Sequence, residues 1–209
     1  MSGGDGADEV VGVSLPQSQY PAAERGAHHP DHDPRLDAEL AAVVTGARRR
    51  ALRDGDRQVD TAHLLHALLE SDPEVRDVFD GPHVARLLGY LVQRAIGYGL
   101  RWQGSVEDSG AVPLLTESDG WSPAAAAALD AAHGRAIRLG RPFERGIDLL
   151  AAVVADPTSR AVEVLGRAGV DAAAVAARLE EAAVQERAAR SAADGDGGRR
   201  AGTGFDGPR

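Results

Sequence analysis

Arg50-Ala51-Leu52-Arg53-Asp54-Gly55 returns later in the chain as Arg135-Ala136-Ile137-Arg138-Leu139-Gly140, at an offset of 85 residues. A leucine pair follows each glycine at the same spacing, Leu64-Leu65 in the first copy and Leu149-Leu150 in the second. Both pairs lie in apolar runs that end in Asp-Pro, although there the copies are one residue out of step. An internal repeat of this kind means that one supersecondary unit occurs twice, so the repeat predicts the architecture.

Helical periodicity and helix-stop signals fill both copies. Asp37 is a predicted N-cap for the first helix, and Gly55 follows the end of that helix. Thr61 is the predicted N-cap of the leucine-rich helix that comes next. In the second copy Ser122 is the predicted N-cap, and Pro123 takes the first helical position, where its missing N–H costs nothing. No strand pattern competes, so we predict an all-α protein in which two tandem, pseudo-symmetric four-helix repeats form one domain.

Composition divides the chain into an ordered centre and two tails. The first segment is rich in Gly, Pro, Ser and acidic residues, and the last contains a run of Gly and Asp, which predicts disorder at both ends. The predicted boundaries are an acidic N-terminal tail at 1–34, a double repeat at 35–184 and a C-terminal tail at 185–209. Within the double repeat we expect repeat one at 36–99, a polar linker at 100–120 and repeat two at 121–184.

Composition also excludes several classes of function. The chain has 209 residues and no Cys, which excludes disulfides, thiolate metal sites and Cys nucleophiles. All 23 basic residues are Arg, so the chain has neither a Walker A lysine nor a lysine for Schiff-base catalysis. A formal net charge of -9 argues against a nucleic-acid-binding surface. No apolar run reaches the roughly 20 residues that span a bilayer, and the N-terminus lacks a signal peptide, so we expect a cytoplasmic protein.

Taken together, the repeat and its helix boundaries resemble the N-terminal repeat domain, or Clp R domain, of AAA+ unfoldases of the ClpC, ClpB and ClpA type. The family motif Gly-His-Asn-Tyr-Ile-Gly-Thr-Glu-His-Leu-Leu aligns with residues 55–65 and again with residues 140–150. Trp121-Ser122-Pro123 resembles the Phe-Thr-Pro that opens the family's second repeat, and Gly169-Val170-Asp171 resembles the turn before its last helix. The resemblance covers about residues 36–184 and implies the Clp N-domain fold.

Two departures from the family pattern affect the expected function. No AAA+ module follows the repeats, so we expect a stand-alone protein without a motor. In ClpC-like proteins the Glu of Thr-Glu-His in each repeat helps to bind arginine phosphate, whereas this chain has Ala62 and Ile147 at those positions. Because an apolar side chain cannot accept hydrogen bonds from a guanidinium, phosphoarginine recognition in the family manner is not expected. The family's histidine is retained as His63 and replaced by Asp148 in the second copy.

The resemblance also implies a ligand-binding surface. In the family, peptide and cyclic-peptide ligands bind near the start of the first helix and between the repeats. The matching positions here are Leu36 and Ala41, and Phe79 and Trp121 are the nearby apolar residues that we expect to anchor a ligand. An alternative for Trp121 is a packing role, in which it staples the second repeat onto the first, as a residue before an N-cap often does.

No group of residues has catalytic or metal-binding spacing. The His- and Asp-rich run at 28–33 has a metal-like composition, but within a predicted tail it is better explained as a solvated cluster. The histidines of the predicted helices are better explained as helix-turn or core-edge residues than as ligands: His63, His66, His83 and His133. We therefore predict neither enzyme activity nor a cofactor nor a physiological metal.

These inferences favour a non-enzymatic peptide- or protein-binding module that acts as an adaptor, regulator or decoy of the Clp protease system. The expected partners are a Clp-type unfoldase or its substrates and peptide ligands, and not nucleic acid or membrane. An alternative is an acidic helical protein that self-associates or regulates a partner outside the Clp system. The sequence leaves the ligand and the oligomeric state open.

Overall fold

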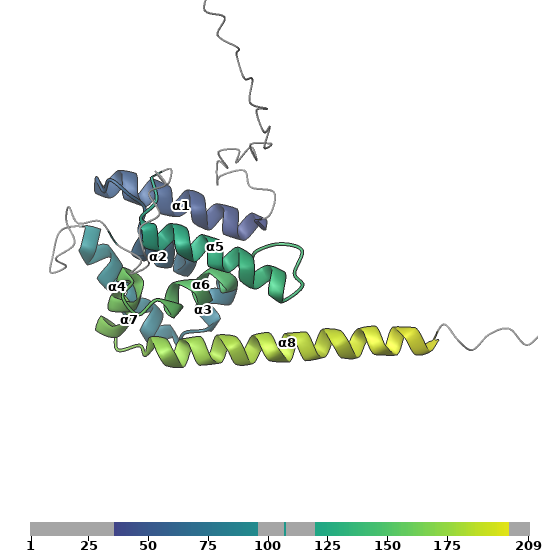
Figure 1. The fold of residues 1–209 in the computed structure, drawn as a ribbon. Helices are drawn as coiled ribbons and strands as arrows, with labels where there is room; N and C mark the ends of the chain where they lie inside the picture. The colour runs from purple at the N-terminus through teal and green to yellow at the C-terminus, as the bar shows by residue number, and fades with distance from the viewer. Residues whose placement is uncertain (1–35, 96–106, 108–119, 201–209) are drawn as a thin grey trace, which may run out of the picture.

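The computed structural model describes residues 36–95, 107 and 120–200, and these residues form eight α-helices and no β-strand. The first four helices are α1 (Ala38–Asp54), α2 (Thr61–Ser71), α3 (Pro73–Asp77) and α4 (Gly81–Ala95). The second four are α5 (Pro123–Arg138), α6 (Gly146–Ala155), α7 (Arg160–Arg167) and α8 (Ala172–Arg200) (Figure 1). The predicted all-α fold of two four-helix repeats is therefore confirmed. Within the described residues, no helix has the length and apolar character that crossing a membrane requires.

The two repeats are joined by a reciprocal pair of main-chain contacts. Leu36, which precedes α1, forms an isolated parallel bridge with Glu144, which precedes α6. Trp121, which precedes α5, forms the equivalent bridge with Val59, which precedes α2. Each residue of the Leu36 bridge has its counterpart 85 positions away in the Trp121 bridge, so a pseudo-twofold axis relates the repeats. The start of each repeat is therefore held by the other repeat.

Asp37 and Ser122 strengthen the two bridges and also begin helices. The Asp37 N–H donates to the Glu144 carbonyl oxygen at 3.2 Å, and the Ser122 N–H donates to the Val59 carbonyl oxygen at 2.8 Å. The Asp37 carboxylate accepts a hydrogen bond from the Leu40 N–H at 2.7 Å, and the Ser122 hydroxyl accepts one in the first turn of α5. Such side-chain acceptors satisfy N–H groups that have no helical partner. Both predicted N-caps are confirmed.

The N-cap of α2 differs from the prediction by one residue. Asp60, and not Thr61, is the cap, and its carboxylate accepts a hydrogen bond from the His63 N–H at 2.9 Å. Thr61 is the first helical residue, and its hydroxyl accepts a hydrogen bond from the Ala161 N–H of α7 at 3.1 Å. The prediction was wrong here because Asp and Thr both favour the cap position, and only the contact with α7 distinguishes them.

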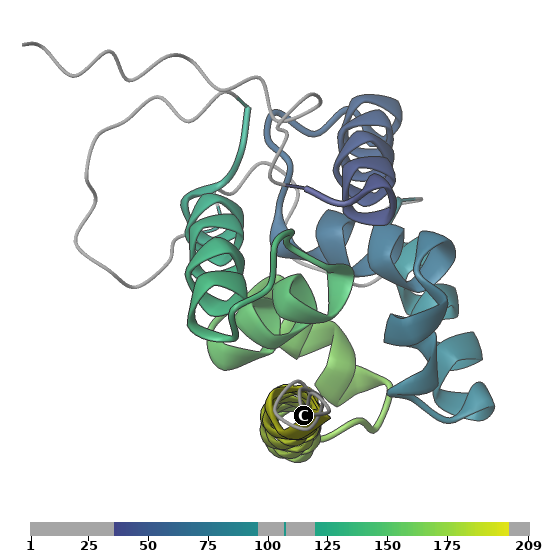
Figure 2. The same ribbon diagram turned by 90° about the vertical axis from the view of Figure 1, so that its right-hand side faces the viewer.

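The hydrophobic core runs through both repeats. Every residue of α2 from Thr61 to Leu69 is buried, and α6 buries Leu149 and Leu150. One cluster of buried apolar side chains includes residues from every described helix. Figure 2 views α8 end-on and shows it packed beneath α6. Because each fully buried leucine contributes roughly 2 kcal/mol, the repeated leucine pairs are a main source of stability.

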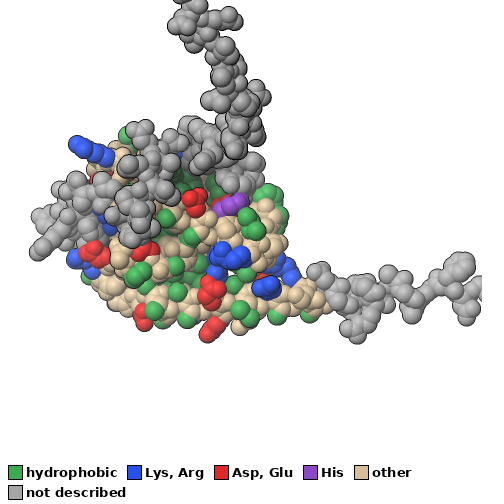
Figure 3. Space-filling model, viewed as in Figure 1, with side chains coloured by type: hydrophobic (Ala, Val, Ile, Leu, Met, Phe, Trp, Pro, Cys, Tyr) green, Lys and Arg blue, Asp and Glu red, His purple; other side chains and the backbone are tan. Residues whose placement is uncertain are grey.

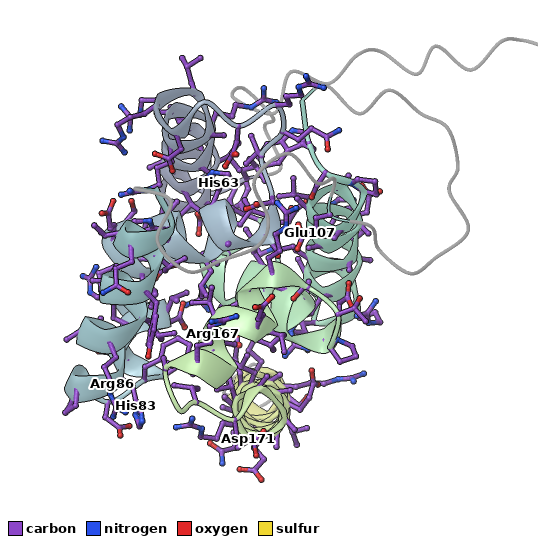
Figure 4. All side chains as sticks on the ribbon, turned by 90° about the vertical axis from the view of Figure 1, so that its left-hand side faces the viewer. His63, His83, Arg86, Glu107, Arg167 and Asp171 are labelled. Carbon is purple, nitrogen blue, oxygen red and sulfur yellow. The ribbon has the colours of Figure 1, made fainter. Side chains whose placement is uncertain are left out.

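Glu107 ties three helix N-termini together (Figure 4). Its buried carboxylate accepts hydrogen bonds from the backbone N–H groups of Thr61 at 2.9 Å and Arg160 at 2.7 Å, and from the hydroxyls of Thr61 and Ser122. These residues begin α2, α7 and α5. The dipoles and free N–H groups of helix N-termini stabilise a negative charge there. The predicted polar linker therefore contains a packing residue; its other positions, Gly120 apart, lie outside the described residues.

The last helix extends further than the sequence predicts. The C-terminal tail was expected from residue 185, but α8 continues to Arg200 and projects from the body (Figure 1). Beyond the predicted end, Glu186 pairs with Arg190 one turn later at 2.9 Å and with Arg141 in the loop before α6. The contact between Glu186 and Arg141 joins residues that are distant in sequence, so local composition could not predict it. Residues 201–209 and the predicted N-terminal tail at 1–34 lie outside the described residues.

Two glycines are expected to respond oppositely to alanine. Gly146 begins α6, and a Cβ atom there would overlap the Asp72 carboxylate and lie 3.1 Å from Leu68 Cδ2. Gly89 is exposed in α4, and a Cβ atom there would meet nothing within 4 Å. We expect Gly146→Ala to lower the free energy of unfolding by about 1–3 kcal/mol through overpacking, and Gly89→Ala to raise it by about 0.5–1 kcal/mol. Urea unfolding measures both, and equal effects would contradict the close packing of α6 on α2.

Removal of the Glu107 carboxylate should destabilise the fold strongly. Glu107→Ala leaves the buried N–H groups of Thr61 and Arg160 without their acceptor, so we expect a loss of about 3 kcal/mol in the free energy of unfolding. Glu181→Ala, at an exposed position of α8, is the control and should change it by less than about 0.5 kcal/mol. Chemical unfolding of both variants makes the comparison. Similar values for the two would show that Glu107 does not hold the helices together.

His66 in α2 makes the stability depend on pH. Burial, with a smaller effect of the neighbouring Arg50 guanidinium, lowers the pKa of His66 from 6.5 to about 4. Between these values the unfolded chain binds a proton that the folded protein excludes, so stability should fall as the pH drops from about 6.5 toward 4. The loss is at most a few kcal/mol, since one pKa unit corresponds to about 1.4 kcal/mol. Urea unfolding of His66→Gln across this range should show a shallower pH dependence than the unsubstituted protein.

Candidate functional site

A cleft opens at the start of α1, next to the Leu36 bridge. It has a volume of about 330 Å³ and lies where the first turn of α1, the loop between α5 and α6 and the outer part of α8 come together. We call it the α1 cleft, and its lining residues are Asp37, Arg141, Pro142, Phe143, Arg145, Glu186 and Arg190. Because the two repeats meet here, the cleft depends on the pseudo-twofold arrangement.

Glu186 of α8 is the centre of an ion-pair network in the α1 cleft. It accepts a hydrogen bond from Arg141 Nε at 3.2 Å, a second one from Arg141 Nη2, and one from Arg190 at 2.9 Å. The hydrogen bonds from Arg141 lower the pKa of Glu186, so this carboxylate stays ionised. Burial by itself would lower the pKa of Arg141, but the hydrogen bonds to Glu186 and Asp148 raise it instead. Arg141 is thus a structural residue, with a side chain 7% exposed.

The accessible positive charges of the cleft belong to Arg145 and Arg190. Their side chains are 39% and 41% exposed, in contrast to that of Arg141. Arg145 also reaches across to repeat one, where it donates to Glu74 of α3 at 2.6 Å. Burial raises the pKa of Glu74 above its ordinary value, while Arg145 acts in the opposite direction. An incoming anionic group can therefore contact two guanidinium groups without entering the core.

Phe143 supplies the apolar wall of the α1 cleft. Its side chain lies in the loop before α6 and is 50% exposed. Large exposed hydrophobic residues in the described part of the chain are few, and the others lie outside this cleft: Leu52, Val92, Ile137 and Val184. An exposed aromatic ring beside charged groups in a concave surface is typical of a binding site. Figure 3 shows acidic and basic side chains close together on the face along which α8 runs.

The predicted binding residues lie in different environments. Leu36 and Ala41 are half-buried near the start of α1, and Leu36 adjoins the cleft residue Asp37. Phe79 and Trp121 are only 6% and 4% exposed and belong to the core. The Arg48 guanidinium lies over the Trp121 ring, 4.9 Å from its centroid. Both aromatic side chains therefore pack in the core. For Trp121 this agrees with the alternative role that its position before an N-cap suggested.

Ala62 and Ile147, which the family resemblance suggested as substituted arginine-phosphate positions, occupy equivalent places in the two repeats. Ala62 is the second residue of α2 and fully buried, and Ile147 is the second residue of α6 and half-buried. One residue further on, His63 and Asp148 share a structural role, because each accepts a hydrogen bond from the backbone N–H of its helix cap. A separate acidic cluster surrounds His63, outside the α1 cleft.

Sequence analysis missed the residues that form the α1 cleft. Arg141, Phe143 and Arg145 lie within the second copy of the repeated motif, but they do not match the family pattern there. Pro142-Phe143 was the available signal, since an aromatic residue in a short polar turn has little apolar surface to pack against. Glu186 and Arg190 fell within the predicted tail, where no local pattern reveals their pairing with the loop before α6.

Comparison with solved structures identifies the fold. The chain is similar to the N-terminal domain of the caseinolytic-protease-associated chaperone ClpD from Arabidopsis thaliana, with a TM-score of 0.52, 17% identity, and coverage of 70% of this chain and 93% of that one. A structure from a malarial protein secretion system matches with a TM-score of 0.51, 18% identity, and coverage of 71% and 95%. No family model and no curated protein matches the sequence. At this identity the likeness concerns the fold alone: the chain has the fold of the Clp N-terminal domain.

Proposed function

We propose that this chain is a non-enzymatic module that binds peptides or exposed segments of partner proteins, as an adaptor, regulator or decoy in the Clp protease system. Its fold is that of a domain that is not catalytic. The α1 cleft carries the proposal, because it combines an exposed aromatic ring with accessible guanidinium groups at the junction of the repeats. A Clp-type unfoldase, or the substrates and peptides that such an unfoldase binds, would be the partner.

The cleft favours a particular chemistry in its ligand. Phe143 offers apolar surface, and Arg145 and Arg190 offer exposed positive charge in a chain whose net charge is -9. A chain with this negative net charge repels acidic surfaces of other proteins. An acidic group can bind only at a local positive site. A segment with an apolar side chain next to an acidic residue or a terminal carboxylate matches both features. The hydrogen bonds between Arg141 and Glu186 hold the cleft in shape before a ligand binds.

Substitution of Phe143 should weaken binding without unfolding the protein. We expect Phe143→Ala to reduce affinity for the bound peptide or unfoldase by about tenfold or more, since an interface aromatic contributes more than 1 kcal/mol. Val92→Ala, at a residue of α4 that is 52% exposed and outside the cleft, is the matched control. Fluorescence anisotropy against a panel of apolar-acidic peptides, and co-purification with the Clp-type unfoldase of the same cell, measure the two kinds of partner.

The outcomes distinguish the possible roles. Binding to the unfoldase with simultaneous delivery of a substrate supports an adaptor, whereas binding to the peptides alone supports a decoy. A Phe143→Ala variant that binds as well as Val92→Ala would exclude the α1 cleft as the site. If neither the peptides nor the unfoldase bound above background, the proposed function would be wrong.

A second candidate, self-association, has its own structural support. Leu52 and Ile137 occupy equivalent positions of α1 and α5, and their side chains are 83% and 62% exposed. Two exposed apolar residues related by the pseudo-twofold axis could be covered by a second molecule with the same symmetry. Light scattering during size-exclusion chromatography would show a dimer that Leu52→Gln together with Ile137→Gln dissociates. A monomer at all concentrations would exclude this role.

A further inference from the structure

Acidic side chains surround His63 near the junction of α1 and α2. Figure 4 labels this histidine. The His63 Nε2 atom lies 3.3 Å from Asp56 Oδ2 and 3.8 Å from Asp54 Oδ2. On the other side of the ring, Nδ1 lies 2.8 Å from Asp60 Oδ1. Ligand atoms of Asp56, Asp60 and His63 all lie within 4.8 Å of one another. None of these residues lines the α1 cleft.

The His63 ring itself points to a missing partner. Its side chain is 1% exposed, yet within the described part of the chain no group forms a hydrogen bond with Nε2. A buried nitrogen without a hydrogen bond costs roughly 1–3 kcal/mol, so proteins rarely leave one. The carboxylate oxygens that Nε2 faces lie 3.3 Å away in Asp56 and 3.8 Å away in Asp54, and neither contact forms a hydrogen bond. The space between the nitrogen and these carboxylates is where a partner would be bound.

Asp60 is placed to orient the imidazole for a metal ion. A proton on Nδ1 can be donated to Asp60 Oδ1 at 2.8 Å, which leaves the lone pair of Nε2 directed at Asp54 and Asp56. The other Asp60 oxygen is held by Arg160 at 2.6 Å. Histidine ligands commonly donate their second ring N–H to a carboxylate in this way. When Nδ1 instead accepts the Asp60 N–H at 3.1 Å, the proton lies on Nε2, so metal binding selects the first tautomer.

The second repeat shows how the equivalent space is filled by the chain itself. At the positions of Asp56 and His63, the second repeat has Arg141 and Asp148, so a guanidinium replaces the loop carboxylate and a carboxylate replaces the imidazole. There the Arg141 guanidinium lies 2.5 Å from Asp148 and also binds Glu186. The Arg141 guanidinium thus connects Asp148, in the first turn of α6, to the carboxylate of Glu186. In repeat one the position equivalent to Arg141 is occupied by the carboxylate of Asp56.

The ligand atoms select a class of ion. Two ligands at about 2.0–2.1 Å from one tetrahedral ion are about 3.4 Å apart, close to the 3.3 Å that separates Nε2 from Asp56 Oδ2. One imidazole nitrogen with carboxylate oxygens suits Zn²⁺ or a similar transition metal. Mg²⁺ and Ca²⁺ prefer oxygen ligands alone. Asp54 and Asp56 are 16% and 31% exposed, which gives an ion a path from solvent.

We propose that His63 Nε2 and the Asp56 carboxylate bind a divalent transition-metal ion such as Zn²⁺, with Asp60 as the positioning carboxylate. The ion bridges the loop after α1 and the start of α2 and so stabilises the first turn of the most buried helix. This site differs from the sequence prediction, which assigned no metal and read His63 as a helix-turn residue.

Zn²⁺ binding by the full-length chain tests the proposal. All proteins carry His28→Ala, His29→Ala and His32→Ala, because the histidines of the N-terminal run could bind zinc independently. Isothermal titration calorimetry with ZnCl₂ should give one ion per chain, and MgCl₂ should give no binding. Asp56→Asn should weaken Zn²⁺ binding by at least about tenfold. Loss of an outer partner of a metal site already costs about that much, and loss of a direct ligand costs no less. Asp77→Asn, an exposed residue of α3, is the matched control and should leave affinity unchanged.

Nitrogen-15 NMR of the imidazole rings separates the proposal from a simple ion pair. With Zn²⁺ present, His63 should carry its proton on Nδ1, and its Nε2 signal should shift as metal-bound nitrogens do. A His63 that keeps protons on both nitrogens in saturating Zn²⁺ would show an imidazolium paired with Asp56, and would overturn the proposal. Equal Zn²⁺ affinity of Asp56→Asn and Asp77→Asn, or no binding of one ion by the parent protein, would also overturn it.

Discussion

The reciprocal main-chain pairing of the two repeats is the constraint on which the other features depend. The Leu36 bridge brings the start of α1 to the start of α6, and the Trp121 bridge brings the start of α5 to the start of α2. The α1 cleft lies beside the first bridge. Glu107 occupies the corresponding region beside the second, where it binds Ser122 and Thr61. One bridge thus has an open cleft beside it, and beside the other the Glu107 carboxylate binds the starts of α2 and α5.

Sequence patterns determined the fold class and most helix ends. The 85-residue repeat, the N-caps Asp37 and Ser122, and Gly55 with its positive φ of 74° all have local signatures, so they could be recognised one by one. Contacts between distant residues have no such signature. The hydroxyl of Thr61 is used by α7, and Glu107 reaches three helices from a segment of polar composition. The end of α8 was missed for the same reason.

The functional site was less predictable than the fold, because hydrophobicity in a sequence does not distinguish a packed side chain from an exposed one. Phe79 and Trp121 have the residue type of ligand anchors but lie in the core, whereas Phe143 in a polar loop is half exposed. The replacement of His63 by Asp148 in the second repeat was visible in the sequence. Its meaning required the burial of the His63 ring and the direction of its Nε2 atom.

The exchange of bridge partners gives the duplicated chain the character of a homodimer whose two subunits were fused. Each repeat supplies one residue to each bridge, so a single repeat would lack the main-chain partners that the other repeat provides. The residues that connect the repeats keep the correct partner at a high effective concentration. A shorter connection that prevented closure within one molecule would lead two chains to swap repeats, and the fold would then assemble as an intertwined pair.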